Sequence, residues 1–320
     1  MLMAKDAHDS KHPSSTTESE ASKPLAPGLY IVATPIGNLE DITLRALRVL
    51  RSVDRVACED TRQTQKLLSH FGIGVPTVSC HAHNERQRAE ELVAELKRGA
   101  RIALVSDAGM PGISDPGEYL VAAAVAAEIP VIPIPGASAV VSALAASGLD
   151  TTSFLFVGFP PARTGERRSF FETLQRERAT MIFYEAPHRV VESLREAIQI
   201  FGAERRAVLA REITKIHEEF LRGTLQELEA SCASRELIRG EMTLLVAGAN
   251  PDASASTAVA AASDLRGAMA MYLGQGLDEQ AALKRVARDR GVSKSEVYRE
   301  WQRESGRRKQ KLPEPKDCRV

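Results

Sequence analysis

Four short segments of the chain concentrate side chains that can exchange protons or hold phosphate. They are 58–62 (CEDTR), 81–85 (HAHNE), 185–189 (EAPHR) and 211–215 (REITK), each at the end of an apolar run or directly before a predicted helix. Carboxylates and histidines can accept a proton, and arginine binds phosphate in a fixed fork. One such segment alone is typical of an ion pair at a strand end. Four in similar positions favour a shared cleft.

Three further segments are rich in glycine and proline and follow predicted strands. They are 34–38 (TPIGN), 106–117 (SDAGMPGISDPG) and 135–139 (PGASA). Open α/β sheets bind ligands at loops beyond the carboxyl ends of their strands, where glycine lets the backbone approach a ligand closely. The first and third segments are also consistent with tight turns alone. The second is longer than a turn requires, so we predict that it is a binding loop.

The usual nucleotide and metal signatures are not found in the sequence. No GxGxxG follows the first predicted strand and no GxxxxGK[ST] occurs, which disfavours a dinucleotide enzyme or a P-loop NTPase. The cysteines are scattered without a CxxC pair. His81 and His83 could hold a metal, but surface and capping roles are favoured, with Asn84 and Gln87 placed to cap the next helix. We predict no metal site.

The elements that must position these segments alternate between apolar strands and helices. Strands are predicted at 29–33, 101–106, 131–134, 154–158, 181–184, 207–210 and 242–247. Helices are predicted at 39–53, capped by Asn38, and at 118–127, 138–147, 166–177 and 190–200. Such alternation predicts an α/β architecture, and two sets of about five strands predict two lobes. We place the lobes at 28–136 and 137–250.

The two ends of the chain depart from this pattern. Residues 1–27 are rich in Ser, Thr, Lys, His and Glu, which predicts a disordered leader without a secretory signal. A linker is predicted at 251–263. Predicted helices at 264–275, 278–290 and 294–303, the last capped by Ser293, form a unit over 264–305 that resembles nucleic-acid-binding helix-turn-helix units. A basic tail at 306–320 is either a solvated end or a nucleic-acid contact.

The composition of the chain limits how it could bind nucleic acid and indicates its cellular compartment. Lys plus Arg and Asp plus Glu number 42 each, so nucleic acid would have to be held by a local basic patch. No apolar run approaches the roughly 20 residues that span a bilayer. We therefore predict a cytoplasmic protein without a membrane partner.

An ordered set of motifs in this chain resembles one family. The motifs are TPIGNLEDITLRAL, CEDTRQTQKLL, HNE, VSDAGMPGISDPG, PIPGASAVVSALAASGL, FLFVGFPP, FYEAPHR, REITKIHEE and GEMTLLVAG. Together they look like the 16S ribosomal RNA cytidine 2′-O-methyltransferases, which lie within the tetrapyrrole methylase fold superfamily. The resemblance covers roughly Gly28 to Gly248, and the C-terminal helical unit is one that such proteins often carry.

The resemblance implies a fold, a cofactor and partners. It implies two α/β lobes with S-adenosylmethionine in the cleft between them, a homodimer, and 16S rRNA of the small ribosomal subunit as substrate. Carried over motif by motif, the implied cofactor contacts are Pro35, Ala108, Gly109, Met110, Ile113, Ser138, Ala139, Tyr184, Glu185, Met242 and Thr243.

Methyl transfer to a ribose hydroxyl needs alignment and a group that accepts the hydroxyl proton. The candidates in the predicted cleft are Glu59, Asp60, Glu185, His188 and Lys215. Of these we predict Asp60 or Glu185 as the proton acceptor. Lys215 is predicted to stabilise the developing alkoxide.

Three arginines are predicted to contact RNA phosphates: Arg62, Arg189 and Arg211. The alternative is that each only pairs with a neighbouring acid. Two other functions also stay open. One is a tetrapyrrole methylase on the same scaffold, which CEDTRQT and the helix-turn-helix-like unit disfavour. The other is a non-catalytic RNA-binding or ribosome-assembly factor with a vestigial cleft.

Overall fold

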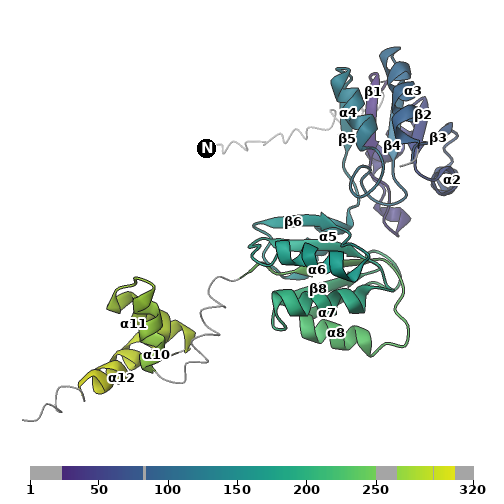
Figure 1. The fold of residues 1–320 in the computed structure, drawn as a ribbon. Helices are drawn as coiled ribbons and strands as arrows, with labels where there is room; N and C mark the ends of the chain where they lie inside the picture. The colour runs from purple at the N-terminus through teal and green to yellow at the C-terminus, as the bar shows by residue number, and fades with distance from the viewer. Residues whose placement is uncertain (1–23, 82–83, 250–264, 291, 307–320) are drawn as a thin grey trace, which may run out of the picture. The chain divides into compact units, whose positions relative to one another are not determined.

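The computed structural model describes residues 24–81, 84–249, 265–290 and 292–306 (Figure 1). Most of the predicted leader, the predicted linker, the tail from residue 307 onward and His83 lie outside the described residues. The chain divides into two compact units. The first comprises 1–175 and 179–247 and holds both sheets, and the second comprises 176–178 and 248–320 and holds the C-terminal helices.

The first sheet is parallel throughout, in the order β3-β2-β4-β1-β5. Its strands are β1 Gly28–Val32, β2 Arg55–Cys58, β3 Thr77–Ser79, β4 Arg101–Val105 and β5 Val131–Ile134. The central strands β1 and β4 are almost wholly buried, as their continuous apolar sequences require of a sheet covered on both faces. Because all five strands run the same way, their carboxyl ends share one edge.

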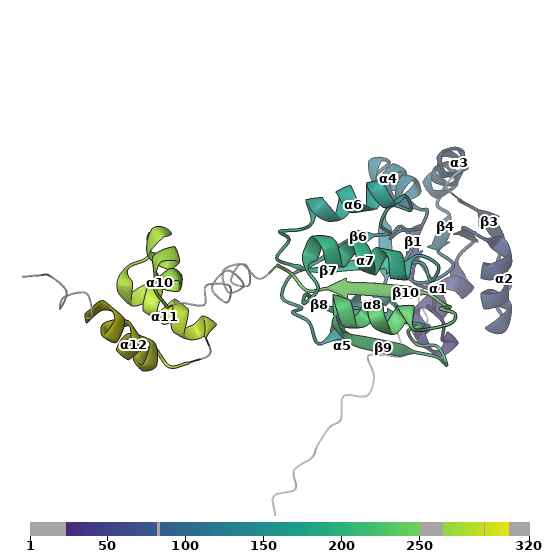
Figure 2. The same ribbon diagram turned by 60° about the horizontal axis from the view of Figure 1, so that its bottom comes forward.

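Helices cover both faces of the first sheet (Figure 2). One face carries α1 Leu44–Ser52 and α2 Thr61–His70, whose Leu50 and Leu68 belong to one apolar core with Val56 of β2. The other face carries α3 Glu85–Lys97 and α4 Glu118–Ala126, which bury Leu92 and Leu120. The sheet is therefore the middle of three layers.

The predicted helix at 39–53 is wrong at its start. Asn38 caps only a 3-10 turn, η1 Leu39–Asp41, by accepting a hydrogen bond from the backbone N–H of Glu40. Ile42 is extended, and α1 begins after Thr43, whose hydroxyl accepts from the Ala46 N–H at 3.0 Å. Two capping side chains five residues apart thus divide the segment, since each favours a new helix start.

The second sheet is mixed, in the order β6-β7-β10-β8-β9. Its strands are β6 Phe154–Gly158, β7 Thr180–Glu185, β8 Arg206–Arg211, β9 Glu219–Thr224 and β10 Met242–Val246. Only β6 and β7 run parallel, while β10 lies antiparallel to both β7 and β8. Strand β9 and the helix that follows it, α8 Leu225–Ala233, are additional to the predicted elements.

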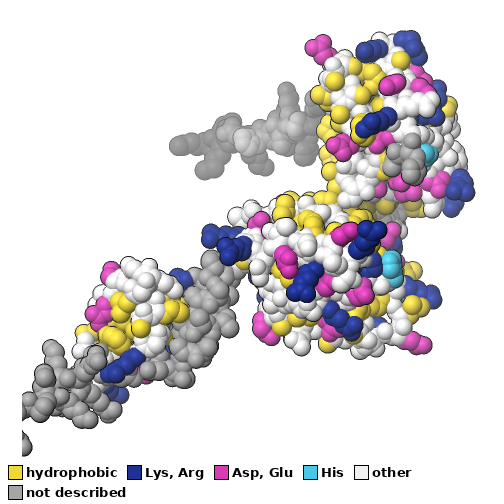
Figure 3. Space-filling model, viewed as in Figure 1, with side chains coloured by type: hydrophobic (Ala, Val, Ile, Leu, Met, Phe, Trp, Pro, Cys, Tyr) yellow, Lys and Arg dark blue, Asp and Glu magenta, His cyan; other side chains and the backbone are white. Residues whose placement is uncertain are grey.

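Side chains of β7 alternate between two cores. Met181 and Phe183 face α6 Thr164–Thr173, α7 Val190–Phe201 and α8, whereas Ile182 faces α5 Ala139–Ser147. This alternation is the period of a strand buried on both sides. The edge strand β6 is less covered: Phe154 and Leu155 are exposed, and Figure 3 shows hydrophobic side chains gathered over β6.

The second unit contains α10 Leu265–Gly274, α11 Glu279–Asp289 and α12 Lys294–Gly306 around a small apolar core. Ser293 caps α12 as predicted, because its hydroxyl accepts from the Glu296 N–H while the Glu296 carboxylate accepts from the Ser293 N–H. Trp301 on α12 donates to Glu279 on α11 at 2.7 Å. In the part of the chain that the structure describes, no helix is long and apolar enough to cross a membrane.

Candidate functional site

The first two glycine- and proline-rich loops are joined to each other. The backbone N–H of Thr34 donates to the carbonyl of Gly109 at 2.9 Å, and Gly109 returns the bond to Thr34 at 3.1 Å. The Ser106 hydroxyl also donates to the Gly109 carbonyl. The third loop lies close by, because a Cβ added at Gly136 would stand 2.8 Å from the Cβ of Ala33. All three loops therefore meet at the carboxyl edge of the first sheet.

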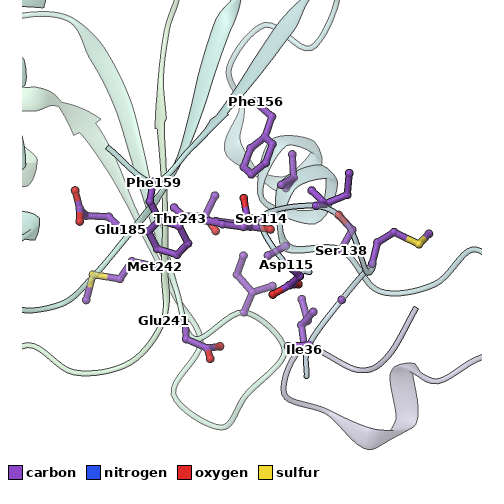
Figure 4. Close-up of a pocket in the computed structure, with 18 of the residues that line it drawn as sticks. Ile36, Ser114, Asp115, Ser138, Phe156, Phe159, Glu185, Glu241, Met242 and Thr243 are labelled. Atoms are coloured by element: carbon purple, nitrogen blue, oxygen red, sulfur yellow. The ribbon is translucent and has the colours of Figure 1, made fainter. Parts of the chain in front are cut away.

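A cavity of about 550 Å³ lies where these loops meet segments of the second sheet (Figure 4). Its lining from the first two loops is Ile36, Ala108, Gly109, Met110, Ile113, Ser114 and Asp115. The third loop and α5 add Ser138, Ala139, Val140 and Val141. The second sheet and its connections add Phe156, Phe159, Tyr184, Glu185, Ala186, Pro187, Ile213, Gly240, Glu241, Met242 and Thr243. The size and largely apolar lining are those of a small-molecule site.

The residues that the family resemblance implies as cofactor contacts come together here. All of them except Pro35 line the cavity. Pro35 is buried between Thr34, which bonds Gly109, and Ile36, which does line the cavity. Pro35 therefore lies beside the cavity lining without forming part of it.

Several lining residues were not among the predicted site residues. Asp115 lies in the segment 106–117, which was predicted to be a binding loop. The sequence therefore pointed to the loop that carries Asp115 but not to this residue. Phe156 and Phe159 are also unpredicted, and their rings pack against that of the predicted Tyr184, with centroids 5.0 Å and 5.4 Å from it. Glu241 precedes β10 and carries no sequence signal of its role.

Asp115 lies among the lining side chains from both sheets (Figure 4). Burial raises the pKa of its carboxyl group to about 6, and the negative charges of Glu59 and Asp107 act in the same direction. A hydrogen bond with the Ser106 side chain partly offsets this shift. Asp115 is thus a cavity carboxyl group that titrates near neutral pH, a property that suits proton transfer.

Glu185 lines the cavity, but its carboxylate is engaged elsewhere. One oxygen accepts from the backbone N–H of Ala186 at 2.8 Å, and the other accepts from the Ser193 hydroxyl. Arg189 pairs with the carboxylate at 3.2 Å, and the Glu185 side chain is only 1% exposed. These bonds fix the turn between β7 and α7. They direct the carboxylate away from the other lining side chains (Figure 4).

Lys215 bridges two acidic residues beside the cavity. Its Nζ donates to Glu212 at 2.8 Å and to the cavity-lining Glu241 at 2.9 Å. Although desolvation opposes it, these two bonds hold the pKa of Lys215 above its usual value. The loop that carries Lys215 is strained, because Glu212 (φ 52°) and Thr214 (φ 69°) adopt the left-handed conformation.

Lys215 also contacts the first loop. A Cβ added at Gly37 would lie 2.7 Å from Cε of Lys215. Only glycine leaves room for the lysine chain to cross this loop, and the φ of 151° at Gly37 is itself one that other residues rarely adopt. The predicted catalytic lysine is therefore positioned by residues from both sheets.

Asp60 and Arg62 lie outside the cavity lining, at the start of α2. Asp60 accepts from the Arg62 N–H at 2.8 Å and so caps the helix, and this bond, with the Arg62 side chain, lowers the pKa of Asp60. The Arg62 side chain is 87% exposed. A backbone hydrogen bond from Asp60 to the carboxyl group of Asp107 joins this segment to the second loop.

The other two predicted phosphate contacts form ion pairs within the protein. Arg189 pairs with Glu185. Arg211 pairs with Glu219 at 3.0 Å and donates to the Arg239 carbonyl at 3.2 Å. Glu219 also pairs with Arg235. The hydrogen bonds from Arg235 and, to a lesser extent, from Arg211 lower the pKa of Glu219 to about 2.

Asn84 and Glu85 of the HNE motif bond neighbouring backbone segments, while His83 lies outside the described residues. Asn84 occupies the N-cap of α3 but does not cap it; its side chain instead accepts from the His81 N–H and donates to the Ser79 carbonyl. Glu85 is buried and accepts from the N–H groups of Gly117 and Tyr119, both at 2.9 Å. It thereby caps α4, which directly follows the binding loop. Among the described residues no cluster of metal ligands occurs.

Comparison with known proteins decides the family. The family model described as Tetrapyrrole (Corrin/Porphyrin) Methylases matches residues 28–229. A protein of Halalkalibacterium halodurans named Ribosomal RNA small subunit methyltransferase I is 47% identical over 86% of this chain and 95% of its own length. The chain belongs to the ribosomal RNA small subunit methyltransferase I family. A member from Pseudomonas aeruginosa is 52% identical over 69% of this chain and 78% of its own length.

Solved structures support the tetrapyrrole methylase fold of this methyltransferase. The crystal structure of the methyltransferase CobJ aligns with a TM-score of 0.54 at 18% identity, covering 69% of this chain and 94% of that one. Diphthine synthase aligns with a TM-score of 0.51 at 16% identity, covering 68% of this chain and 89% of that one. At such low identities the likeness concerns the fold alone. The predicted α/β fold class is confirmed.

Proposed function

We propose that this protein transfers a methyl group from S-adenosylmethionine to the ribose 2′-hydroxyl of a cytidine in 16S ribosomal RNA. The observation that carries the proposal is one cavity that gathers ten of the eleven residues implied as cofactor contacts. The names of the relatives, at 43–52% identity, support rRNA of the small subunit as the substrate. An rRNA substrate accords with the predicted cytoplasmic location.

The cavity suits the proposed cofactor. The Phe156, Phe159 and Tyr184 rings offer an apolar wall for a purine, and Ser138 and Thr243 offer polar groups among apolar neighbours. Gly109, with its φ of 82°, lets the second loop approach a ligand without a side chain in between. When bound there, S-adenosylmethionine supplies an electrophilic methyl group.

Asp115 is the residue that we propose as acceptor of the 2′-hydroxyl proton. It lines the cavity, and burial raises its pKa to about 6, which makes the ionised form a stronger base than an ordinary carboxylate. Glu185, whose oxygens are already bonded, is proposed to hold the turn that carries Tyr184 and Pro187. Asp60, which bonds Asp107 through its backbone, is proposed to position the second loop.

Lys215 is proposed to stabilise the developing negative charge at the cavity mouth. The pair with Glu241 brings its ammonium beside a lining residue, and the high pKa keeps it charged. Of the predicted phosphate contacts, Arg62 is proposed to meet the RNA directly because its side chain extends into solvent. Arg189 and Arg211 would have to exchange their present pairs for phosphates.

Two further parts of the proposal concern RNA binding by the C-terminal helical unit and the formation of a homodimer. The predicted helix-turn-helix-like unit, α10–α12, is proposed as a second RNA contact. The exposed hydrophobic side chains Phe154 and Leu155 on the edge strand β6 support a homodimer interface over this strand (Figure 3). The oligomeric state is measured by sedimentation velocity.

Two assays separate this function from its alternatives. Calorimetric titration with S-adenosylmethionine tests the cleft: absence of binding would favour the non-catalytic assembly factor. Tritiated S-adenosylmethionine offered with small subunits and, separately, with a tetrapyrrole tests the acceptor. We expect label on the RNA, whereas label on the tetrapyrrole alone would reverse the assignment.

A further inference from the structure

The helices on the two faces of the first sheet differ in charge. Together α1 (LRALRVLRS) and α2 (TRQTQKLLSH) contain five Lys and Arg residues and no Asp or Glu. On the opposite face, α3 (ERQRAEELVAELK) and α4 (EYLVAAAVA) contain five Glu and three Lys and Arg residues. In a chain whose formal charge is zero, this segregation gives the α1/α2 face a local positive field.

The cations of this face are available to a ligand. Arg45, Arg51, Arg62 and Lys66 are exposed. Within the described ranges, no ion pair involves Arg45, Arg51 or Lys66, in contrast to the paired Arg189 and Arg211 near the cavity. Arg51 donates to the Phe71 carbonyl and Lys66 to the Gln63 side chain, and Arg62 pairs with Asp60 at 3.4 Å with its side chain 87% exposed. These bonds lie at the solvent-exposed surface, so exchanging them for a phosphate costs little.

The face is also hollowed. A shallow depression runs along the exposed side of α2 and the start of β3, lined by Thr61, Arg62, Gln65, Lys66, Ser69 and Thr77. Every lining side chain is polar or basic and none is acidic. Arg62 and Lys66 stand one helical turn apart on it, so both can reach one anion. Threonine, serine and glutamine add hydrogen-bond donors of the kind that contact phosphate oxygens and sugars.

This face leads to the proposed active site. Helix α2 starts directly after Glu59 and Asp60, and Glu59 is close enough to Asp115 to raise its pKa. Helix α1 follows the loop that contains Ile36 of the cavity and Gly37 beside Lys215. Both helices therefore begin at the sheet edge that bears the cavity and run away from it.

We propose that the α1/α2 face binds the phosphate backbone of the RNA that leads into the cavity. The residues that contact the phosphates are Arg45, Arg51, Arg62 and Lys66. The depression on α2 holds one of these phosphates. The occupant is a phosphodiester chain, since the depression is lined only by polar and basic side chains and the exposed charges of α1 and α2 are all positive. This proposal rests on the proposed function, which supplies the RNA.

The test compares two triple variants of the full chain. Arg45→Gln/Arg51→Gln/Lys66→Gln removes three cations from the α1/α2 face. Lys97→Gln/Arg98→Gln/Arg206→Gln removes three exposed cations from elsewhere, so the change in net charge is the same. Binding of a fluorescein-labelled oligonucleotide of small-subunit rRNA sequence is measured by anisotropy at several salt concentrations. Melting temperature and S-adenosylmethionine affinity report on folding and on the cavity.

We expect the first variant to bind RNA at least about ten-fold more weakly and the control to bind as the unmodified protein does. The slope of log K against log salt should become shallower by about 2 to 3, since each lost phosphate contact removes about 0.7 to 0.9. S-adenosylmethionine affinity should be equal in all three proteins.

Equal RNA affinity and equal salt slope in both variants would overturn the proposal. RNA binding that weakens as much in the control would also overturn it, since net charge alone would then explain the effect. Failure of the proposed function has a different signature: the unmodified protein would transfer no methyl group to small-subunit rRNA, whatever the anisotropy of the variants.

Discussion

Thr34 and Gly109 exchange two backbone hydrogen bonds, at 2.9 and 3.1 Å, although they belong to loops that are 75 residues apart in sequence. This single bridge makes the first two loops one support for the cavity. Ile36 and Gly109, on either side of this bridge, both line the cavity, whereas Pro35 does not. The site therefore depends on the backbone of these loops as much as on their side chains.

Gly37→Ala should disturb Lys215 without changing any charged residue. The added methyl group would overlap the lysine chain and force its Nζ away from Glu212 and Glu241. Displacements of about 1 Å near a reaction centre can cost about a hundred-fold in rate. We expect kcat/KM for methyl transfer to fall by at least about ten-fold. Gly74→Ala is the control, because no atom lies within 4 Å of its added Cβ, and an equal loss there would contradict this role of Lys215.

Asp115→Asn should abolish a pH dependence. A proton acceptor must be ionised, so kcat/KM of the unmodified enzyme should fall as pH drops through about 6. The variant should lose this acid limb and lower kcat by about a hundred-fold or more. Glu59→Gln removes one of the charges that raise the pKa of Asp115, so its acid limb should move to lower pH. An unchanged limb in both variants would exclude Asp115 as acceptor.

The same carboxyl group has a consequence for stability. Its pKa is raised in the folded protein from 3.8 to about 6, so the folded state binds more protons than the unfolded state between these values. The ionised group therefore destabilises the fold at neutral pH, and the penalty vanishes below about pH 4. We expect Asp115→Asn to melt at neutral pH no lower than the unmodified protein. A lower melting temperature would mean that the carboxylate has a structural bond.

Arg167→Leu should lower the free energy of unfolding, because Arg167 joins α6 to α7 beside the second sheet. Arg167 is fully buried on α6 and bonds Glu196 and Glu192 of α7, so its loss leaves Glu196 buried without its partner. Breaking a buried pair on one side costs about 3 to 5 kcal/mol. The neighbouring Arg168→Leu removes an exposed pair with Glu172 and should cost less than about 1 kcal/mol. Urea denaturation measures both, and similar losses would contradict the difference in burial.

Deletion of 264–320 should weaken RNA binding and leave the affinity for S-adenosylmethionine intact. The cavity lies wholly in the first unit, whereas the deleted helices belong to the second. Calorimetry with S-adenosylmethionine and anisotropy with labelled RNA measure the two affinities on one preparation. Unchanged RNA affinity would mean that the helical unit and the basic tail do not contact RNA.

The sequence allowed β1, β4 and β5 of the first sheet and the loops of the cavity to be predicted, because continuous apolar strands and glycine-rich turns are local signals. The short strands β2 and β3 of the same sheet were not predicted. Strand β9 (EFLRGT) was not predictable, since it is an edge strand with neither an apolar run nor regular alternation. The late start of α1 at Leu44, after the extended Ile42, was not predicted either. Both Asn38 and Thr43 are capping residues, and the sequence does not show which of them begins the helix.

The chemical roles within the site depended on tertiary contacts. Glu185 and Asp115 look equivalent in sequence as acids at strand ends or in loops. Only the fold shows that Ser193 and Arg189 occupy the carboxylate of Glu185, while Asp115 lies in the cavity near two other acids. Likewise Asn84, a typical capping residue, bonds back to Ser79 and His81, and α4 is capped instead by Glu85 from another helix.

The most direct test of the central claim is to identify the methylated atom. Small subunits from a strain lacking this enzyme are incubated with the protein and S-adenosylmethionine carrying a deuterated methyl group, and the 16S rRNA is digested to nucleosides for mass spectrometry. We predict that the label appears in 2′-O-methylcytidine, and that Asp115→Asn protein produces far less of it. Label on a base, or no label on RNA while the protein binds S-adenosylmethionine, would contradict the account.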